Sequence, residues 1–299
     1  MNSPSEQIVV TGASGRLGLA VAHLLEGQSY RVVRTDIAPP PASTAQFIAA
    51  DLREYDQVQR VLSGSHTVVH LGNHPGLGAS DPQNVFNENV TINENVFQCA
   101  AEVGAQHIIF ASTIQLFGSK PDLETVIRPP QRPTFPITDD TPPAPSNLYS
   151  LSKQVSEVML KFYAERCGVT TTALRLPLLH HREPHFAVTA GTENEHDIFE
   201  GFTSLTYADA AQLVLSIVTS NLTGFNAFNI GVSDRHLDYS IKELSKAFYE
   251  ELPSDVTRII DLGPVTSMTG WEPTKVEWQE ESIREPKGCL LYTSPSPRD

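Results

Sequence analysis

The chain has 299 residues, 40% hydrophobic and 19% charged, which is enough to bury one large core with or without a smaller lobe. Its 35 acidic and 21 basic residues give a formal charge of −14 and are spread along the chain. This excludes nucleic-acid binding, which needs clustered Lys and Arg, and no apolar run is long enough to cross a bilayer. The three cysteines have no framework spacing, and a strand follows the N-terminus directly, so we expect a cytoplasmic protein.

Short apolar segments alternate with amphipathic ones through the first half of the chain. We predict strands at residues 7–11, 31–36, 46–51, 67–71, 107–111 and 170–176, and helices at 17–25, 57–62, 85–103 and 146–167. Strands rich in Val and Ile that alternate with helices indicate a parallel sheet covered on both faces. The expected fold class is therefore α/β, a doubly wound Rossmann sheet that binds a dinucleotide.

The second half of the chain is less regular. Residues 119–147 are proline-rich and aperiodic, which predicts a long loop, and long loops in compact domains are often functional. Beyond residue 177 we predict an irregular stretch at 178–202, helices at 207–218 and 240–252, and a strand at 227–230.

These patterns suggest a division of the chain into two parts and a tail. Residues 1–177 form the dinucleotide-binding domain, to which 206–235 return, while 178–205 and 236–288 form a small C-terminal substrate lobe. Residues 289–299 match an in-frame translation of a transposase sequencing adapter. We therefore expect a non-native tail without function; a genuine disordered tail is the alternative.

The segment Thr11-Gly-Ala-Ser-Gly-Arg-Leu-Gly18 lies directly between the first strand and the first helix. A helix N-terminus carries unpaired N–H groups and partial positive charge, so it can hold a diphosphate. Gly12 and Gly15 allow a tight turn and a close approach of phosphate, and Gly18 lets the helix pack against the strand. The predicted cofactor contacts of this turn are Gly12, Ser14, Gly15, Arg16, Leu17 and Gly18.

Two acidic residues follow neighbouring strands. Asp36 ends the second strand, where a carboxylate can accept hydrogen bonds from the adenosine ribose and repels a 2′-phosphate, which favours NAD over NADP. Arg16 and Arg34 lie close enough in sequence to compensate such a phosphate, so NADP stays open. Asp51 and its neighbour Leu52 are placed to reach the adenine; a helix cap is the alternative role for Asp51.

Tyr149 and Lys153 stand four residues apart on a predicted helix and therefore share a face. A tyrosine near its reference pKa of about 10 is a poor base at neutral pH. A nearby ammonium and a positive nicotinamide would favour the phenolate, which brings proton transfer within reach. Lys153 could also hold the nicotinamide ribose, and Thr113 or Ser112 could orient the substrate oxygen. The alternative is an ordinary exposed helix pair.

From Ile8 to about Pro273 the chain resembles the extended short-chain dehydrogenase/reductase family, in its branch of NAD-dependent sugar epimerases and dehydratases. Besides the glycine turn and Tyr149-x-x-x-Lys153, the similar segments are residues 68–73, 89–95, 110–118, 136–143, 174–177 and 206–209. Within residues 89–95 the chain departs from the family pattern, because Ile92 replaces a glycine and Asn93 replaces a threonine.

The resemblance implies a role for each catalytic position. Tyr149 becomes the acid/base, Lys153 its partner, Thr113 the orienting hydroxyl and Asn89 a structural support for the lysine. Ser112 would lie close to the substrate.

The resemblance also implies NAD as the cofactor and a homodimer formed through the helices at 85–103 and 146–167. The further cofactor contacts that it implies are Leu71, Gly72, Asn73, Asn89, Tyr149, Lys153 and Pro177.

The compact length and the segments at 70–73 and 270–273 are most similar to the uronate dehydrogenase branch, whose members oxidise a free sugar acid. A nucleotide-sugar epimerase usually has an Asn shortly after Arg175, and this chain does not. Arg182 is the only Lys or Arg between Leu176 and Asp234, so we hypothesise that it anchors a substrate carboxylate; a solvated loop arginine is the alternative.

Three functions therefore stay open from the sequence: a sugar or sugar-acid dehydrogenase, a nucleotide-sugar epimerase that retains its NAD, and a non-catalytic NAD(P)-binding sensor. The presence of both Tyr149 and Lys153 favours catalysis, and Ile114-Gln115 after Thr113 disfavours dehydration, which needs an acid/base pair there. His180, His181 and His185 do not have zinc-site spacing, so no metal is predicted.

Overall fold

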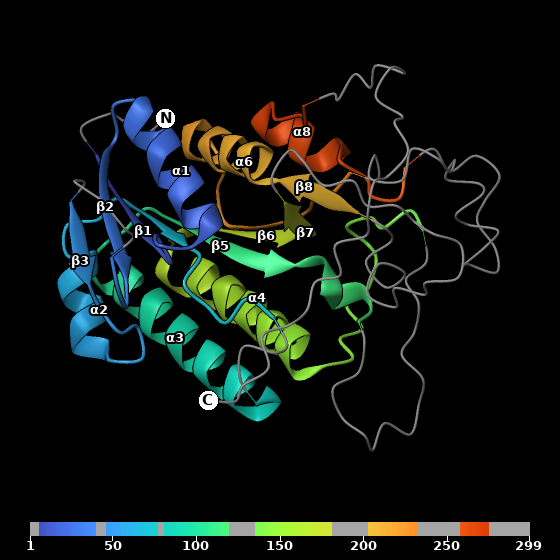
Figure 1. The fold of residues 1–299 in the computed structure, drawn as a ribbon. Coiled ribbons are helices and arrows are strands. Elements are labelled where there is room, and N and C mark those ends of the chain that lie inside the picture. The colour runs from blue at the N-terminus through green and yellow to red at the C-terminus, as the bar shows by residue number, and fades with distance from the viewer. Residues whose placement is uncertain are drawn as a thin grey trace, which may run out of the picture.

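The computed structural model describes residues 6–39, 46–76, 81–119, 135–180, 203–232 and 258–274. At its centre lies a seven-stranded sheet in the order β3-β2-β1-β4-β5-β6-β9, in which every neighbouring pair is parallel (Figure 1). The strands are β1 (Gln7–Thr11), β2 (Arg31–Asp36), β3 (Phe47–Ala49), β4 (Thr67–His70), β5 (His107–Thr113), β6 (Thr170–Leu176) and β9 (Phe225–Asn229). This confirms the doubly wound fold, with the strand order reversing between β1 and β4.

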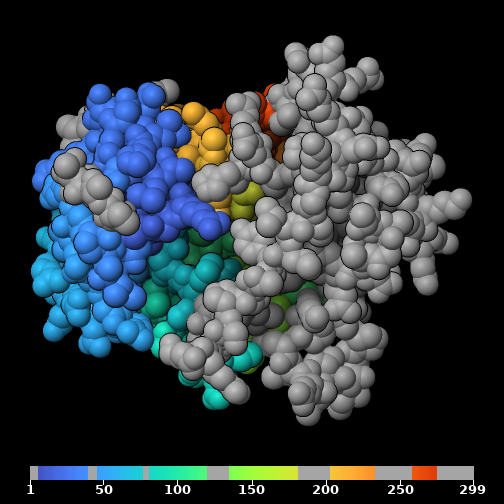
Figure 2. All heavy atoms as spheres, in the orientation of Figure 1, coloured from blue at the N-terminus to red at the C-terminus, as the bar shows by residue number. Residues whose placement is uncertain are grey.

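Helices cover both faces of the sheet (Figure 1). One face carries α1 (Arg16–Gly27) and α6 (Tyr207–Thr219), with α8 (Gly263–Thr269) beside α6. The other face carries α2 (Tyr55–Leu62), α3 (Pro82–Glu102) and α4 (Leu148–Cys167). In Figure 2 the residues of α1 and α2, in blue, lie on the left of the view. Among the described helices, none combines the length and the apolar character that a bilayer crossing requires.

Alternate side chains of each strand enter different cores, which explains the apolar runs in the sequence. Within β5, Ile109 packs with the α1 and α6 side chains, whereas Ile108 and Phe110 pack with those of α2, α3 and α4. All three are fully buried. A strand with both faces covered has no solvated side, so its sequence shows a continuous hydrophobic run instead of alternation.

Several boundaries differ from the prediction. The third strand is limited to β3 (Phe47–Ala49), and the last described strand, β9, begins two residues earlier than expected. Four short elements were missed: η1 (Ile114–Phe117), α8, and the parallel strands β7 (Leu178–His180) and β8 (Ser204–Thr206). Each has only three to seven residues, too few for a periodic pattern.

Part of the predicted organisation lies outside the described residues. This applies to the helix expected at 240–252, to the tail at 289–299 and to most of the loop expected at 119–147. The division into a dinucleotide-binding domain and a small lobe stays a prediction.

Candidate active site

A cavity of about 1050 Å³ lies at the carboxyl ends of the central strands. The crevice outside these ends, where the strand order reverses, is where open α/β sheets bind ligands. The predicted site residues that line it are Gly12, Gly15, Arg16, Leu17, Gly18, Asp36, Asp51, Leu52, Leu71, Gly72, Asn73, Ser112, Thr113, Tyr149, Lys153 and Pro177. Ser14 and Asn89 stand behind this lining, and Arg182 lies outside the described residues.

The glycine turn is packed too closely for side chains. A Cβ added to Gly12 would lie 2.7 Å from the carbonyl carbon of Leu71, and one added to Gly18 would lie 2.1 Å from the carbonyl oxygen of Gly12. Gly15 is the N-cap of α1 and provides no capping side chain. The first N–H groups of α1 are therefore presented to the cavity without a side-chain cap, as an anion site requires.

Asp36 is held at the edge of this turn. The backbone N–H of Ser14 donates to one carboxylate oxygen at 3.0 Å, and that of Ile37 donates to the other at 2.8 Å. Arg34 is turned away: it is buried and donates to both carboxylate oxygens of Glu26, at 2.9 and 2.6 Å. The suggestion that Arg34 compensates a 2′-phosphate is therefore wrong, because its charge is already paired at the far end of α1.

Asp51 is part of a turn and not a helix cap. It accepts hydrogen bonds from the backbone N–H and the guanidinium of Arg53, whereas the N-cap of α2 is Glu54. The capping alternative is therefore wrong. The hydrogen bonds from Arg53 hold the pKa of the Asp51 carboxyl below its ordinary value.

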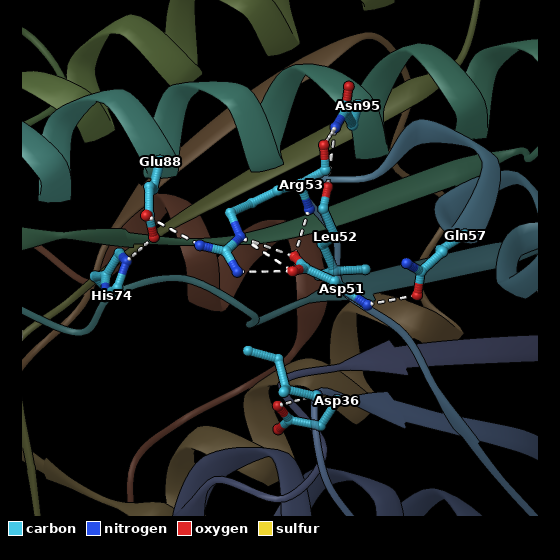
Figure 3. Close-up of polar contacts among 9 residues, drawn as sticks. Asp36, Asp51, Leu52, Arg53, Gln57, His74, Glu88 and Asn95 are labelled. Carbon is cyan, nitrogen blue, oxygen red and sulfur yellow. Dashed lines mark hydrogen bonds and ion pairs between the residues drawn. The ribbon is translucent and has the colours of Figure 1, made fainter.

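Arg53 also begins a line of ionisable side chains along the cavity wall, shown in Figure 3. Its guanidinium donates to Glu88 at 3.1 Å, and the other oxygen of Glu88 lies 2.7 Å from Nε2 of His74. The bond with His74 lowers the pKa of Glu88. All three side chains line the cavity. The sequence did not predict them as site residues, because they come from three separate segments: the loop after β3, helix α3 and the loop after β4.

Tyr149 and Lys153 also line the cavity, and both come from the first turns of α4. Asn147 begins this helix as its N-cap, with a capping box in which its side chain accepts from the backbone N–H of Ser150 at 2.7 Å. Tyr149 is 7% exposed and Lys153 is 3% exposed, so the alternative of an exposed helix pair is wrong.

The Lys153 ammonium is held by two acceptors. Its Nζ donates to Oδ1 of Asn73 at 2.7 Å and to the carbonyl oxygen of Ala111 at 2.8 Å, and it lies 5.7 Å from the centre of the Tyr149 ring. Burial lowers the pKa of Lys153 to about 7, an effect partly opposed by the nearby charge of Glu157. Burial therefore makes the Lys153 ammonium easier to deprotonate than a lysine in water.

The two hydroxyls at the end of β5 differ in their surroundings. Oγ1 of Thr113 accepts from the backbone N–H of Gln115 at 3.2 Å, which leaves its own proton to be donated. Oγ of Ser112 donates to Glu157 at 2.6 Å, and Glu157 is paired with the buried Arg175 at 2.8 Å. The geometry favours Thr113 as the orienting hydroxyl, because the Ser112 hydroxyl is directed into the buried ion pair.

Asn89 does not hold Lys153 directly. Its Oδ1 accepts from the backbone N–H of His74 at 2.8 Å, and its Nδ2 donates to Oγ of Ser152 at 3.3 Å. Ser152 in turn donates to the carbonyl oxygen of Tyr149 at 2.7 Å. Asn89 therefore supports the helical turn that carries Tyr149, and the direct contact with the lysine is made by Asn73.

The predicted histidines are only partly described. His180 lies 3.2 Å from the hydroxyl of Ser204, while His181 and His185 are outside the described residues. Within the described ranges, no three His, Cys, Asp or Glu side chains gather in a group that could hold a metal ion.

A family model described as "NAD dependent epimerase/dehydratase family" matches residues 8–186, more than half of the chain. The chain belongs to this family. The matched residues include the glycine turn, Asp36, Thr113, Tyr149 and Lys153, so this epimerase/dehydratase match includes residues that line the cavity.

Relatives within the epimerase/dehydratase family are distant. The chain is 27% identical over 178 residues to a uronate dehydrogenase of Pseudomonas syringae pv. tomato, which covers 58% of this chain and 60% of that protein. It is 26% identical over 189 residues to an NAD-dependent glucose-6-phosphate dehydrogenase of Haloferax volcanii, covering 60% and 71%. The match thus spans about three fifths of the uronate dehydrogenase.

Solved structures support the fold. A UDP-glucose 4-epimerase of Thermus thermophilus in complex with NAD is similar with a TM-score of 0.66 at 20% identity, over 92% of this chain and 96% of that one. A mutated uronate dehydrogenase is similar with a TM-score of 0.65 at 19% identity, over 90% and 82%.

Proposed function

We propose that this protein is an NAD-dependent oxidoreductase or epimerase that acts on a sugar or sugar acid. The observation that carries the proposal is the cavity itself, which joins an anion-binding glycine turn and Asp36 to the buried pair of Tyr149 and Lys153. A site built only to bind a dinucleotide has no need of a buried tyrosine beside a buried ammonium. Membership of the epimerase/dehydratase family supports the same conclusion.

The residues fit a bound NAD. The turn from Gly12 to Gly18 would hold the pyrophosphate, because added side chains would collide there, and Asp36 would accept hydrogen bonds from the adenosine ribose. Lys153 would hold the nicotinamide ribose. When bound, NAD supplies a hydride acceptor.

The chain's own residues would move the proton. Lys153 in its charged form favours the phenolate of Tyr149, which can then accept the proton of a substrate hydroxyl. The Thr113 hydroxyl donates to the same substrate oxygen and fixes its position. Since Ile114 and Gln115 follow Thr113, the acid/base pair that expulsion of water would require is missing from these positions, and dehydration is disfavoured.

Two observations bear on the substrate. The relatives at 27% and 26% identity are a uronate dehydrogenase and a glucose-6-phosphate dehydrogenase, both acting on free sugars that carry an anionic group. We infer an anionic sugar as the first substrate class to test. The role of Arg182 as its anchor stays a hypothesis.

The test mixes NAD with the purified protein and a panel of uronic acids, sugar phosphates and neutral sugars, and follows the absorbance of reduced nicotinamide. The Tyr149→Phe variant should abolish NADH formation. The matched control is Tyr163→Phe, a tyrosine farther along α4 whose ring packs against Phe97, and it should retain NADH formation.

The outcomes separate the alternatives. NADH formation that is lost only with Tyr149→Phe establishes a dehydrogenase. NAD binding without NADH, together with interconversion of a nucleotide sugar, indicates an epimerase that retains its cofactor. NAD binding without any turnover of either substrate class contradicts catalysis and leaves the sensor.

We further propose that the protein is a homodimer formed through α3 and α4. On α4 the side chains of Leu151, Val158 and Phe162 share one face and are exposed, Val158 by 66% and Phe162 by 54%. Large apolar side chains that gather on one helix face are typical of an interface. The cytoplasmic location is proposed on the cysteine pattern alone.

Light scattering tests the dimer. Phe162→Asp should halve the mass measured for the wild type, because it places a charge in the proposed interface. The matched control, Met268→Asp, changes an apolar side chain on α8 that is 48% exposed and should leave the mass unchanged. A wild-type monomer contradicts the proposal.

A further inference from the structure

A continuous line of hydrogen bonds connects the start of the glycine turn to the catalytic lysine. We name it the Thr11–Lys153 chain; its members are Thr11, His70, Asn93, Asn73 and Lys153. The successive distances are 2.7 Å from Oγ1 of Thr11 to Nδ1 of His70, 2.8 Å from Nε2 of His70 to Oδ1 of Asn93, 2.7 Å from Nδ2 of Asn73 to the same Oδ1, and 2.7 Å from Nζ of Lys153 to Oδ1 of Asn73.

Burying the polar side chains in the middle of the Thr11–Lys153 chain costs free energy unless they are hydrogen-bonded. Thr11, His70 and Asn93 are all completely buried, and His70 packs against the rings of Phe97 and Phe110, each at 5.8 Å between ring centres. Buried polar groups are tolerated only when their hydrogen bonds are satisfied. Each of these side chains is hydrogen-bonded to a neighbouring member, and Thr11 and Asn93 have further partners outside the five residues, so the line forms one connected network.

Every donor in the network has a fixed direction. Nδ2 of Asn93 donates to Oγ of Ser156 at 2.6 Å, which turns Oδ1 of Asn93 toward His70 and Asn73. Because a carbonyl oxygen only accepts, Nε2 of His70 must carry the ring proton, and Nδ1 accepts from the Thr11 hydroxyl. Burial lowers the pKa of His70 to about 3, so the ring is neutral and keeps this tautomer at physiological pH.

The direction is passed on to Asn73. Its Nδ2 donates to Oδ1 of Asn93 and, at 2.9 Å, to the carbonyl oxygen of Gly72, so its own oxygen faces Lys153. If the amide turned over, two N–H groups would face the ammonium. The acceptors that Asn93 and Gly72 offer therefore keep an oxygen, and not an NH₂ group, beside the lysine, and Asn93 provides the shorter of the two hydrogen bonds.

We propose that Asn93 is a positioning residue for the reaction: it orients the amide of Asn73 and thereby stabilises the charged form of Lys153. This inference rests on the proposed function of Tyr149 and Lys153. Asn93 does not line the cavity, and it stands where the resembled family pattern has a threonine.

The consequence for catalysis follows from coupled titration. Tyr149 and Lys153 are close enough to titrate as a pair. When the pair loses its first proton, the product is either a phenolate beside an ammonium or a phenol beside a neutral amine. Only the first form can act as a base. When the ammonium loses an acceptor, more of the pair adopts the second form, so the plateau rate falls and the half-maximal point of the pH profile moves to lower pH.

The experiment measures kcat/KM against pH for the wild type and three variants. Asn93→Leu removes the acceptor, Asn93→Thr restores an oxygen of smaller reach, and Asn73→Ala removes the oriented amide at a half-buried position that folding tolerates more easily. For Asn93→Leu and Asn73→Ala we expect a plateau lowered about tenfold and a half-maximal pH lower by about one unit, the effect of losing one hydrogen bond to a charged group. Asn93→Thr should recover most of both.

The matched control is Asn95→Leu. Asn95 is a buried asparagine on the same helix, but its Nδ2 donates to the carbonyl oxygens of Leu52 and Arg53 on the adenine side of the site. Its replacement should leave the half-maximal pH unchanged. If Asn93→Leu lowers the rate without moving the half-maximal pH, or if Asn95→Leu moves it equally, Asn93 is a folding residue only and the proposal fails.

A second readout needs no substrate. The folded pKa of Lys153 lies below its value in the unfolded chain, so the free energy of unfolding rises with pH between about 7 and 10.4, and Lys153→Met removes this rise. Asn93→Leu should extend the rise to lower pH. If the wild type is inactive but Asn93→Leu extends the rise in stability to lower pH, the proposed function is contradicted and the network is supported. If the wild type is active but Asn93→Leu changes neither the pH profile nor the pH dependence of stability, the network alone is contradicted.

Discussion

His70 makes the stability of this protein sensitive to acid. The side chain is completely buried, and burial lowers its pKa from an ordinary 6.5 to about 3. Above pH 6.5 the ring is neutral in the folded and unfolded chain, so its full contribution is present. Between 6.5 and about 3 only the unfolded chain takes up the proton, so stability falls as the pH falls, and below about 3 the loss is complete.

The magnitude follows from the size of the shift. At about 1.4 kcal/mol for each pKa unit, His70 accounts for a loss of about 5 kcal/mol over the whole range and about 3 kcal/mol between pH 7 and pH 4. A loss of that size is a large share of the total stability of a typical domain.

Urea denaturation followed by circular dichroism, at steps between pH 7 and pH 4, measures this directly. The comparison is with His70→Gln, which cannot titrate. The free energy of unfolding of the wild type minus that of the variant should fall by about 3 kcal/mol over this range. His107, whose pKa burial also lowers, to about 4, is present in both proteins and cancels. A constant difference would refute the reasoning, because His70 would then accept a proton without cost.

Three further predictions follow from the site. Gly18→Ala should weaken NAD binding in calorimetric titration at least tenfold, whereas Gly27→Ala, which meets no atom within 4 Å on the same helix, should leave it unchanged; equal losses would contradict the steric argument. Asp36→Ser should lower the ratio of NAD to NADP affinity, and an unchanged ratio would exclude Asp36 from the choice. Arg175→Met should cost about 3–5 kcal/mol in thermal unfolding by leaving Glu157 unpaired, and adding Glu157→Leu should recover part of this; no recovery would show that the pair is not the cause.

The sequence was most informative where one local pattern decides the structure. Two local patterns predicted residues that line the cavity: the glycine turn between a strand and a helix, and the four-residue spacing of Tyr149 and Lys153. The strand at 170–176 was predicted with its observed boundaries, because its three successive β-branched threonines favour a strand and Pro177 follows it directly.

The sequence was least informative where a contact joins distant segments. Arg53, Glu88 and His74 show no local sequence pattern. They lie in line along the cavity only because two loops and helix α3 meet there. For the same reason the hydrogen bond from Lys153 to Asn73, which lies 80 residues from the lysine, was not predicted. Arg34 was misjudged because its distance from Asp36 in sequence says nothing of the direction in which its side chain turns.

Helix α4 has one further consequence. One side of it carries Tyr149 and Lys153 into the cavity, while another exposes Val158 and Phe162 to solvent, all on a single rigid rod of 20 residues. If a second copy docks on Val158 and Phe162, dimerisation and NAD binding involve the same helix, and a change in the position of α4 at one site affects the affinity at the other. Thermodynamic reciprocity then requires that NAD tighten the dimer by the same factor by which dimerisation tightens NAD.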